Sequence, residues 1–61
     1  MENFILRIET GNAAFAEPNT LTEIAEILRQ VAARLDRGDP AGTIFDGNGN
    51  SVGEFAPQFS S

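Results

Sequence analysis

Residues 3–10 follow a period of two that places an apolar side chain at every second position, which is the pattern of a β-strand with one buried side. Within the segment from residue 3 to residue 10, Phe4, Leu6 and Ile8 fall on one side and Ile5 falls on the other. Gly11 and Asn12 then break the pattern. We therefore expect a first strand that packs one strongly apolar side against the rest of the fold.

The period changes to that of an α-helix over residues 20–37, where apolar residues recur at intervals of three and four. The stripe is formed by Leu21, Ile24, Leu28, Val31 and Leu35, and Ile27 widens it. This spacing also suits a coiled coil. The stretch is only about two and a half heptads long and is flanked by strand patterns, so we expect the helix to pack on a sheet.

Both ends of this helix carry recognisable signals. Thr20 and Glu23 have the spacing of a capping box, in which each side chain accepts from the other residue's backbone N–H. Gly38 is placed to take the left-handed conformation that ends a helix, and Pro40 prevents continuation. The helix is therefore expected to begin at Thr20 and to end just before Gly38.

The connection from residue 13 to residue 19 contains one large apolar side chain, Phe15. Phe15 either closes one end of the core or stands exposed as an anchor for a partner. The sequence leaves both possibilities open.

The stretch DGNGNSVGEF, residues 46–55, has oxygen-bearing side chains at alternate positions and poses a choice between a calcium loop and a hairpin turn. An EF-hand loop that starts at Asp46 requires glycine at its sixth position and a bidentate carboxylate at its twelfth. Those positions hold Ser51 and Pro57. Asn48-Gly49 is a strong hairpin signal, so we favour two strands, residues 43–46 and 51–56, joined by a type I′ turn.

Together these elements predict an α+β fold of β-α-β-β order: a three-stranded, mainly antiparallel sheet with one amphipathic helix packed on one face. We expect a single domain over residues 1–57 and a flexible C-terminal tail over residues 58–61. The third strand lies either at the edge or in the middle of the sheet. The middle position makes every pairing antiparallel and accounts for Gly53, and we favour it.

One helix covers only one face of a three-stranded sheet, and neighbouring residues of a strand point to opposite faces. In the two-residue hairpin register, Phe45 pairs with Val52 and Ile44 with Gly53, which leaves apolar residues on both faces. We therefore expect an uncovered apolar face that drives association into a homodimer, unless Phe59 in the tail folds back over it. The residues expected to form this self-association face are Ile5, Ile44, Phe45, Val52 and Phe55.

The composition removes most routes to catalysis. The chain has no cysteine, histidine, lysine or tyrosine, so thiolate and imidazole chemistry, zinc–thiolate sites and disulfides are excluded. The glycine-rich DGNGN segment lacks the lysine of a phosphate-binding loop. We expect no catalytic residues, no cofactor and no metal, and hence a protein that is not an enzyme.

The formal net charge is −5. The residues of the predicted helix contribute nothing to this net charge, because the three carboxylates there are balanced by three arginines. A surface of this sign repels phosphate groups, so direct binding to nucleic acid is not expected, whereas a basic protein surface is a suitable partner. The acidity also suits the simpler role of keeping a small protein in solution. The candidate partner-binding residues are Glu9, Glu17, Asp39, Asp46 and Glu54.

No apolar run approaches the length of about 20 residues that crosses a bilayer, and the N-terminal segment lacks a basic region. We expect no membrane association and a location in the cytoplasm.

Three segments together resemble a group of small proteins encoded by bacteriophages, prophages and plasmids, which have no assigned activity. They are IETGNAAF at residues 8–15, EIAEILRQVAARL at residues 23–35 and NGNSVGEF at residues 48–55. The group's IET-x-NAAF opening and D-x-NGN-x-VG close carry no catalytic residue, and Phe45 stands where a polar residue is more usual. The resemblance implies origin in a mobile element, a bacterial host cytoplasm and a binding role.

Size, charge and resemblance together favour a non-enzymatic phage accessory protein that inhibits a host protein complex by occupying a basic surface. A CRISPR effector or another nucleic-acid-handling defence complex is the leading class of target. Two alternatives remain: a homodimeric structural or regulatory accessory protein without a defence role, and a small-ligand sponge.

Overall fold

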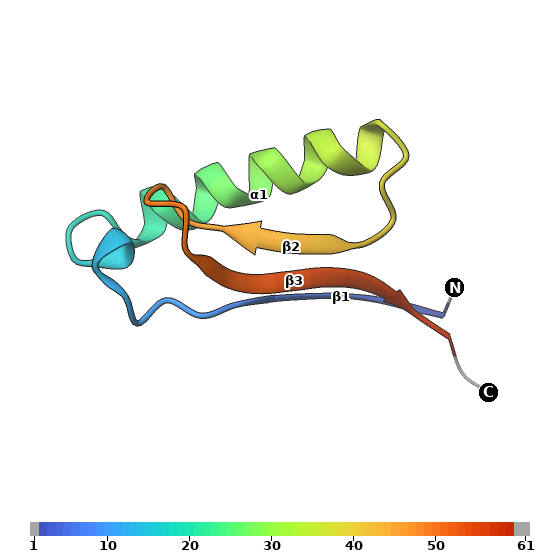
Figure 1. Cartoon of the computed structure of the whole chain (residues 1–61), viewed down its shortest axis with the longest axis horizontal. Helices are drawn as coiled ribbons and strands as arrows, with labels where there is room; N and C mark the ends of the chain where they lie inside the picture. The colour runs from blue at the N-terminus through green and yellow to red at the C-terminus, as the bar shows by residue number, and fades with distance from the viewer. Residues whose placement is uncertain (1, 60–61) are drawn as a thin grey trace.

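A computed structural model describes residues 2–59 of the chain. The observed order is strand, short 3-10 helix, α-helix, strand and strand, so the predicted β-α-β-β order is confirmed (Figure 1). The elements are β1 (Asn3–Ile8), η1 (Ala13–Phe15), α1 (Thr20–Asp36), β2 (Gly42–Phe45) and β3 (Ser51–Gln58). The molecule is elongated, with principal extents of 40 × 23 × 17 Å.

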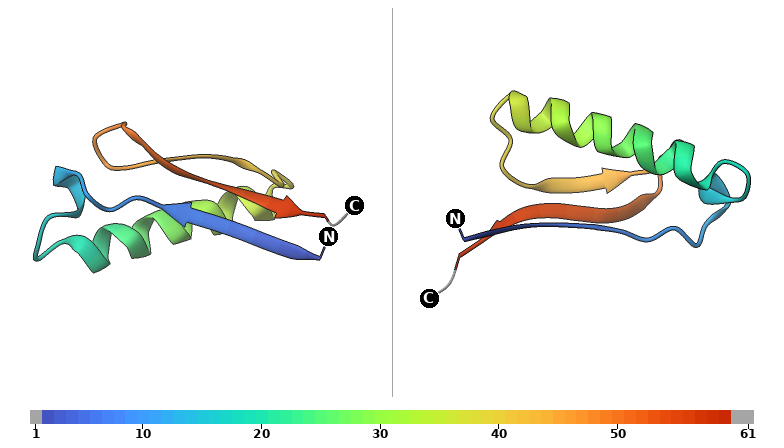
Figure 2. Two further views of the ribbon diagram at one scale, coloured as in Figure 1. Left: turned by 90° about the horizontal axis from the view of Figure 1, so that it is seen from below. Right: turned by 180° about the vertical axis from the view of Figure 1, so that it is seen from behind.

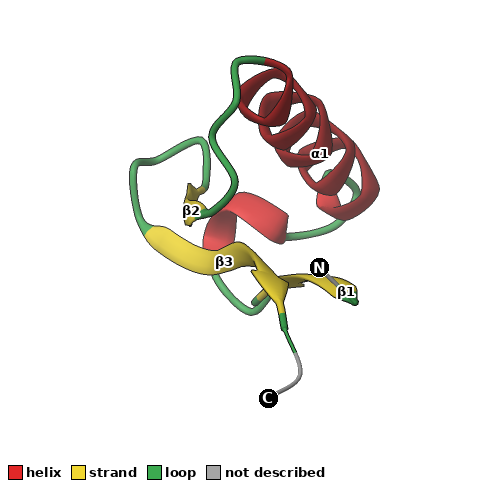
Figure 3. Ribbon diagram, turned by 90° about the vertical axis from the view of Figure 1, so that its right-hand side faces the viewer, coloured by secondary structure: helices red, strands yellow, loops and turns green. Residues whose placement is uncertain are grey.

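The three strands form one sheet in the order β1-β3-β2, and both pairings are antiparallel. The third strand therefore lies in the middle, as favoured from the sequence. α1 covers one face of this sheet and leaves the opposite face bare (Figures 2 and 3). We call this bare side the open face.

The pairing register assigns each strand residue to a face. Ile8 and Ile44 both lie opposite Gly53, and Leu6 lies opposite Phe55, so these residues share the side that faces α1. This side supplies half of the buried core, and α1 and η1 supply the other half. The buried apolar residues are Phe15, Ile27, Val31, Ile44, Val52 and Phe55.

The hairpin differs from the type I′ turn expected from Asn48-Gly49. The loop has three residues, because the N–H of Asp46 donates to the carbonyl of Asn50 (2.9 Å) and the N–H of Gly49 donates to the carbonyl of Asp46 (3.1 Å). Among the turn residues only Gly49 has a positive φ, of 84°, whereas a type I′ turn needs two such residues. The predicted hairpin is confirmed, but the predicted type I′ turn is wrong.

The three-residue loop brings a β-bulge with it, and the bulge changes which residues are exposed. Ile44 pairs with Gly53 as expected, but Phe45 pairs with Ser51, so that Val52 is an extra residue on β3. Regular alternation would place Val52 on the side of Glu54, yet Val52 is only 4% exposed and belongs to the core.

The predicted self-association face is therefore wrong for three of its five residues. Ile44, Val52 and Phe55 are buried in the core, because the bulge and the helix-facing register direct them inward. Ile5 and Phe45 remain exposed, to 49% and 52%. Phe59 is 67% exposed, so the alternative in which it folds back as a cover is also not observed.

α1 begins and ends where the sequence indicated, but the interactions at its N-terminus differ. The Thr20 hydroxyl donates to the carbonyl of Phe15, and the Glu23 carboxylate accepts from the hairpin residue Gly47, so the capping box does not form. At the other end Gly38 has a φ of 95° and donates to Leu35, while Asp39 donates to Arg34. These two bonds form a Schellman motif, as the glycine predicted.

Phe15 closes one end of the core and is only 2% exposed, so its interpretation as a core residue is confirmed. It sits in η1, whose first N–H groups are capped by Asn12 through a bond from the N–H of Ala14 to the Asn12 side chain (3.1 Å). The Glu17–Pro18 peptide bond that follows is cis.

β3 is longer than expected, because it continues through Pro57 to Gln58, where the Gln58 carbonyl accepts from the N–H of Glu2. Pro57 is tolerated in the middle strand because it lies beyond the start of β2, whose first residue Gly42 pairs with Phe55. The proposed tail therefore begins after Gln58, and its last residues, 60 and 61, lie outside the described part of the chain. No helix within residues 2–59 is long and apolar enough to cross a membrane.

Candidate functional site

The hairpin loop is organised around the carboxylate of Asp46, which is only 7% exposed. One carboxylate oxygen accepts the backbone N–H groups of Asn48 (2.8 Å) and Asn50 (2.9 Å). The other accepts the side-chain amides of Asn12 (2.6 Å) and Asn50 (3.3 Å). Asp46 therefore fixes the loop internally and joins it to the segment that precedes η1.

These donors favour the ionised carboxylate. The backbone N–H of Asn50 contributes most to holding the pKa of Asp46 below its ordinary value. Burial opposes this effect, while the N–H of Asn48 and the side chains of Asn50 and Asn12 add to it. Asp46 thus carries a permanent charge at neutral pH, with its oxygens directed to donors inside the protein.

The sequence-based choice between a calcium loop and a hairpin is answered by this geometry. The Asp46 oxygens accept from N–H groups, and the Glu23 carboxylate near the loop accepts from the N–H of Gly47 (2.9 Å). Within residues 2–59 no group of three or more acidic, histidine or cysteine side chains is arranged to hold a metal ion. The hairpin interpretation is confirmed by the β2–β3 pairing.

Because the loop is already closed by its own donors, calcium is expected to leave the stability of the protein unchanged. We predict that about 5 mM Ca²⁺ shifts the thermal midpoint by less than about 1 °C. This concentration is above the dissociation constants of the weakest protein calcium sites, which are about 1 mM. Magnesium at the same concentration controls for ionic strength. A calcium-specific rise of several degrees that follows the calcium concentration would contradict this prediction.

The open face carries a charged cluster at its centre. Arg7 lies opposite Glu54 in the register, and its guanidinium makes two bonds to the Glu54 carboxylate, of 3.0 and 2.8 Å. The same guanidinium contacts Glu9 at 2.5 Å. The side chains of Glu9 and Glu54 remain 72% and 56% exposed, so one arginine is shared by two carboxylates that face solvent.

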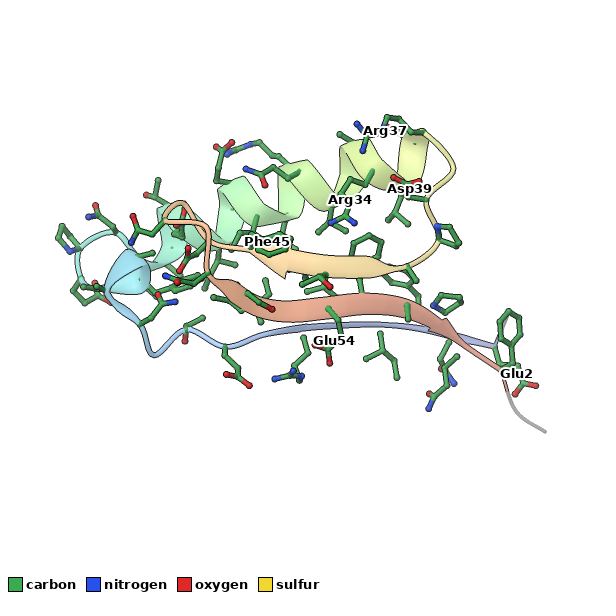
Figure 4. The ribbon with its side chains drawn as sticks, in the orientation of Figure 1. Glu2, Arg34, Arg37, Asp39, Phe45 and Glu54 are labelled. Atoms are coloured by element: carbon green, nitrogen blue, oxygen red, sulfur yellow. The ribbon has the colours of Figure 1, made fainter. Side chains whose placement is uncertain are left out.

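Two exposed apolar side chains accompany this cluster on the open face. Ile5 lies two residues before Arg7 on β1, and Phe45 lies at the end of β2, next to Ser51 of β3. Figure 4 shows Glu54 and Phe45 on the sheet, distant from Glu2 and Asp39. The open face thus combines a net negative charge with two apolar side chains available for contact.

The structure separates the five acidic residues that the sequence grouped as partner contacts. Glu9 and Glu54 are brought together by Arg7. The Glu17 carboxylate lies 3.0 Å from the Thr20 hydroxyl at the start of α1, and Asp39 contacts Arg37 past the other end of that helix. Asp46 is buried, so it is not available as a surface contact.

A second apolar surface was not identified from the sequence. Leu21, Leu28 and Leu35 of α1 are 79%, 46% and 39% exposed, although they belong to the stripe expected to pack on the sheet. We call these three residues the leucine flank. The leucines recur every seven residues, and this spacing, which also suits a coiled coil, is the signal that the sequence contains.

No pocket is found in the described part of the chain. Comparison of the chain with models of known families, with curated proteins and with solved structures found no match.

Proposed function

We propose that this protein acts by binding another protein through its open face, and that the partner presents a basic surface. The observation that carries this proposal is the composition of that face: Glu9 and Glu54 share Arg7, and Phe45 and Ile5 stand exposed beside them. Exposed aromatic and aliphatic anchors beside charged groups are the usual ingredients of a protein-binding surface.

The charge distribution supports this choice of face. The residues of α1 include three carboxylates and two arginines, and Arg37 at its C-cap balances them, so the net charge of −5 resides on the other parts of the chain. A partner with a basic groove is therefore attracted to the sheet and the loops rather than to the helix.

The class of partner that fits this charge best is a complex that normally holds nucleic acid. We propose a host defence complex in the bacterial cytoplasm, with a CRISPR effector as the leading class, and inhibition by occupation of its basic surface. This step rests on the resemblance to phage and plasmid proteins and on the acidic charge.

The test compares exposed carboxylates of the open face with an exposed carboxylate of α1. Glu9→Gln with Glu54→Gln removes two charges from the open face, and both side chains keep their size. We expect this variant to bind a purified effector complex at least about tenfold more weakly than the wild type, with a shallower dependence on salt. Glu26→Gln is the control, because Glu26 also pairs with one arginine, Arg29, but lies on α1.

Binding that is equal for the wild type and the double variant would overturn the open face as the binding surface. The choice of target is tested separately by transforming plasmids into bacteria with an active RNA-guided defence complex. Expression of the chain is expected to raise the number of transformants. An unchanged number, in bacteria in which the chain is present, would overturn the defence complex as the target.

A further inference from the structure

The leucine flank is an apolar surface on the side of α1 that does not reach the sheet. Ile27 and Val31 of the same helix are 2% and 4% exposed, which shows where the helix meets the core. Leu21, Leu28 and Leu35 lie about a fifth of a turn away from these residues, at intervals of seven, and are exposed. Contiguous apolar surfaces of this kind on small proteins usually mark an interface.

Contacts made by the other side of α1 explain why this flank is bare. Glu23 accepts from Gly47 in the hairpin, and Arg34 donates to the carbonyl of Thr43 in β2 (2.6 Å) and stacks over the ring of Phe55. These contacts hold α1 towards the β2 side of the sheet. The flank therefore lies on the side of β1.

β1 is correspondingly less covered than the rest of the core-facing surface. Phe4 packs on Phe55, with ring centroids 6.1 Å apart, yet 40% of Phe4 is exposed. Leu6 and Ile8 are only partly buried, whereas Ile44 on β2 is 3% exposed. The leucine flank and Phe4 are thus both exposed on the side of the molecule where β1 is incompletely covered.

The charges of the chain favour a second copy of the same protein as the occupant of this surface. Two acidic chains repel each other wherever their excess carboxylates approach, but α1 and its C-cap carry three carboxylates and three arginines and are neutral. The leucine flank is thus an apolar surface on the neutral part of the chain. The leucine flank offers no electrostatic attraction to a basic partner, in contrast to the open face.

The available area matches a weak, transient self-complementary interface. A tenth of the 4232 Å² surface is about 400 Å² per copy, or about 800 Å² for the pair, which is below the size of standard stable interfaces. The three leucines and Phe4, with the exposed fractions given above, provide apolar surface of that order. Ala25 and Ala32 lie beside the leucines on the outer side of α1, and their small side chains let a second helix approach closely.

We propose that two copies of this chain associate through their leucine flanks, with the two α1 helices antiparallel about a two-fold axis near Leu28. In this arrangement Leu21 of one copy packs against Leu35 of the other, and the two Leu28 side chains meet. Asp36 then lies near the positive N-terminal end of the partner's helix, whereas a parallel arrangement places the two Asp36 carboxylates side by side. This inference is independent of the function proposed for the open face.

Sedimentation equilibrium of the full chain between about 1 µM and 1 mM tests the association, because this concentration range detects weak, transient dimers. Leu28→Glu is expected to raise the dissociation constant at least about 30-fold, because it puts a charge at the centre of the interface. Leu21→Glu should weaken association as well. It keeps the fold, because 79% of Leu21 is exposed and glutamate suits the first turn of a helix.

Phe45→Glu is the matched control, since Phe45 is exposed to a similar extent as Leu28 but lies on the open face. Its dissociation constant should stay within about threefold of the wild type, in the range of a surface change outside the interface. A chain that remains monomeric at 1 mM would overturn the proposal, and so would association that is lost in Phe45→Glu and kept in Leu28→Glu. The Glu9→Gln, Glu54→Gln variant should dimerise normally, which separates this proposal from the proposed function.

Single cysteines test the orientation, because the chain has none of its own. Under mild oxidation Leu28→Cys is expected to form a covalent dimer, since the two positions meet at the axis. Leu21→Cys alone should not cross-link, but a mixture of Leu21→Cys and Leu35→Cys should form the mixed dimer. Efficient self-cross-linking of Leu21→Cys would indicate parallel helices and overturn the antiparallel arrangement.

Discussion

Replacement of Gly53 by alanine is expected to remove most of the stability of the protein. Gly53 lies in the middle strand, opposite Ile8 and Ile44, and an added Cβ would overlap the carbonyl oxygen of Arg7. It would also come within 2.8 Å of the Arg7 carbonyl carbon and 3.1 Å of the Ile8 Cα. These are backbone atoms of a paired strand, so β1 has to move as a whole.

The expected cost of Gly53→Ala is about 3 kcal/mol or more, against a total of only about 5 kcal/mol for a domain of this size. The thermal midpoint, followed by circular dichroism at low micromolar concentration, should fall by about 15 °C or more.

Two other glycines provide graded controls. Alanine at Gly11 meets no atom within 4 Å, and the backbone there has no positive φ, so Gly11→Ala should leave the midpoint within about 3 °C of the wild type. Gly49 is also in open space but has a φ of 84°, so Gly49→Ala should cost only the strain of that conformation, about 1 kcal/mol. A Gly53→Ala protein as stable as Gly11→Ala would show that β1 and β3 do not approach this closely.

Asp46→Asn is expected to lower the thermal midpoint by about 5 to 10 °C at neutral pH, although it removes a negative charge from an acidic protein. Asparagine retains one oxygen for the N–H groups of Asn48 and Asn50. Its amide group then points at the side-chain amides of Asn12 and Asn50, so donors face donors where the wild type has an acceptor.

The exchange of the two partners is a sharp control for this interpretation. In Asn12→Asp with Asp46→Asn, one oxygen of residue 12 still accepts from the N–H of Ala14, and the other accepts from the new amide at position 46. The double variant should recover at least half of the lost stability. If the two changes are simply additive, the contact between residues 12 and 46 does not carry the effect.

The pH dependence follows from the direction of the Asp46 pKa shift. The pKa of Asp46 is lowered in the folded protein, so its stabilising effect is complete above the ordinary aspartate pKa of about 3.9 and is lost as the pH falls further. The midpoints of the wild type and of Asp46→Asn should therefore differ most near pH 7 and converge below about pH 4. A difference that stays constant down to pH 2 would contradict this assignment.

Much of the architecture could be derived from local sequence patterns. The alternation around Leu6, the 3-4 spacing in α1 and the glycine at position 38 identified β1, the helix and its end, because each depends on neighbouring residues alone. The position of β3 in the middle of the sheet was favoured because it makes every pairing antiparallel and accounts for Gly53, where a Cβ would overlap the backbone of β1.

The candidate surfaces were harder to derive, because they depend on one extra residue in a hairpin and on where a helix lies over a sheet. The bulge at Val52 moved that side chain into the core and thereby reduced the expected apolar face to Ile5 and Phe45. The contacts of Glu23 and Arg34 with the hairpin and β2 place α1 off-centre, which exposes Leu28. Neither displacement can be read from periodicity, which defines faces but not lateral position.

The amino-acid sequence by itself determined that one helix and three strands form, their order, the ends of the helix and the acidic charge of the chain, because these follow from side-chain periodicity, backbone preferences and composition. Tertiary structure alone decided that Asp46 is an internal acceptor, that Glu9 and Glu54 share Arg7, and that the leucine flank is uncovered. These features join residues far apart in the chain, and their geometry is fixed only once the strands have paired and the helix has settled on them.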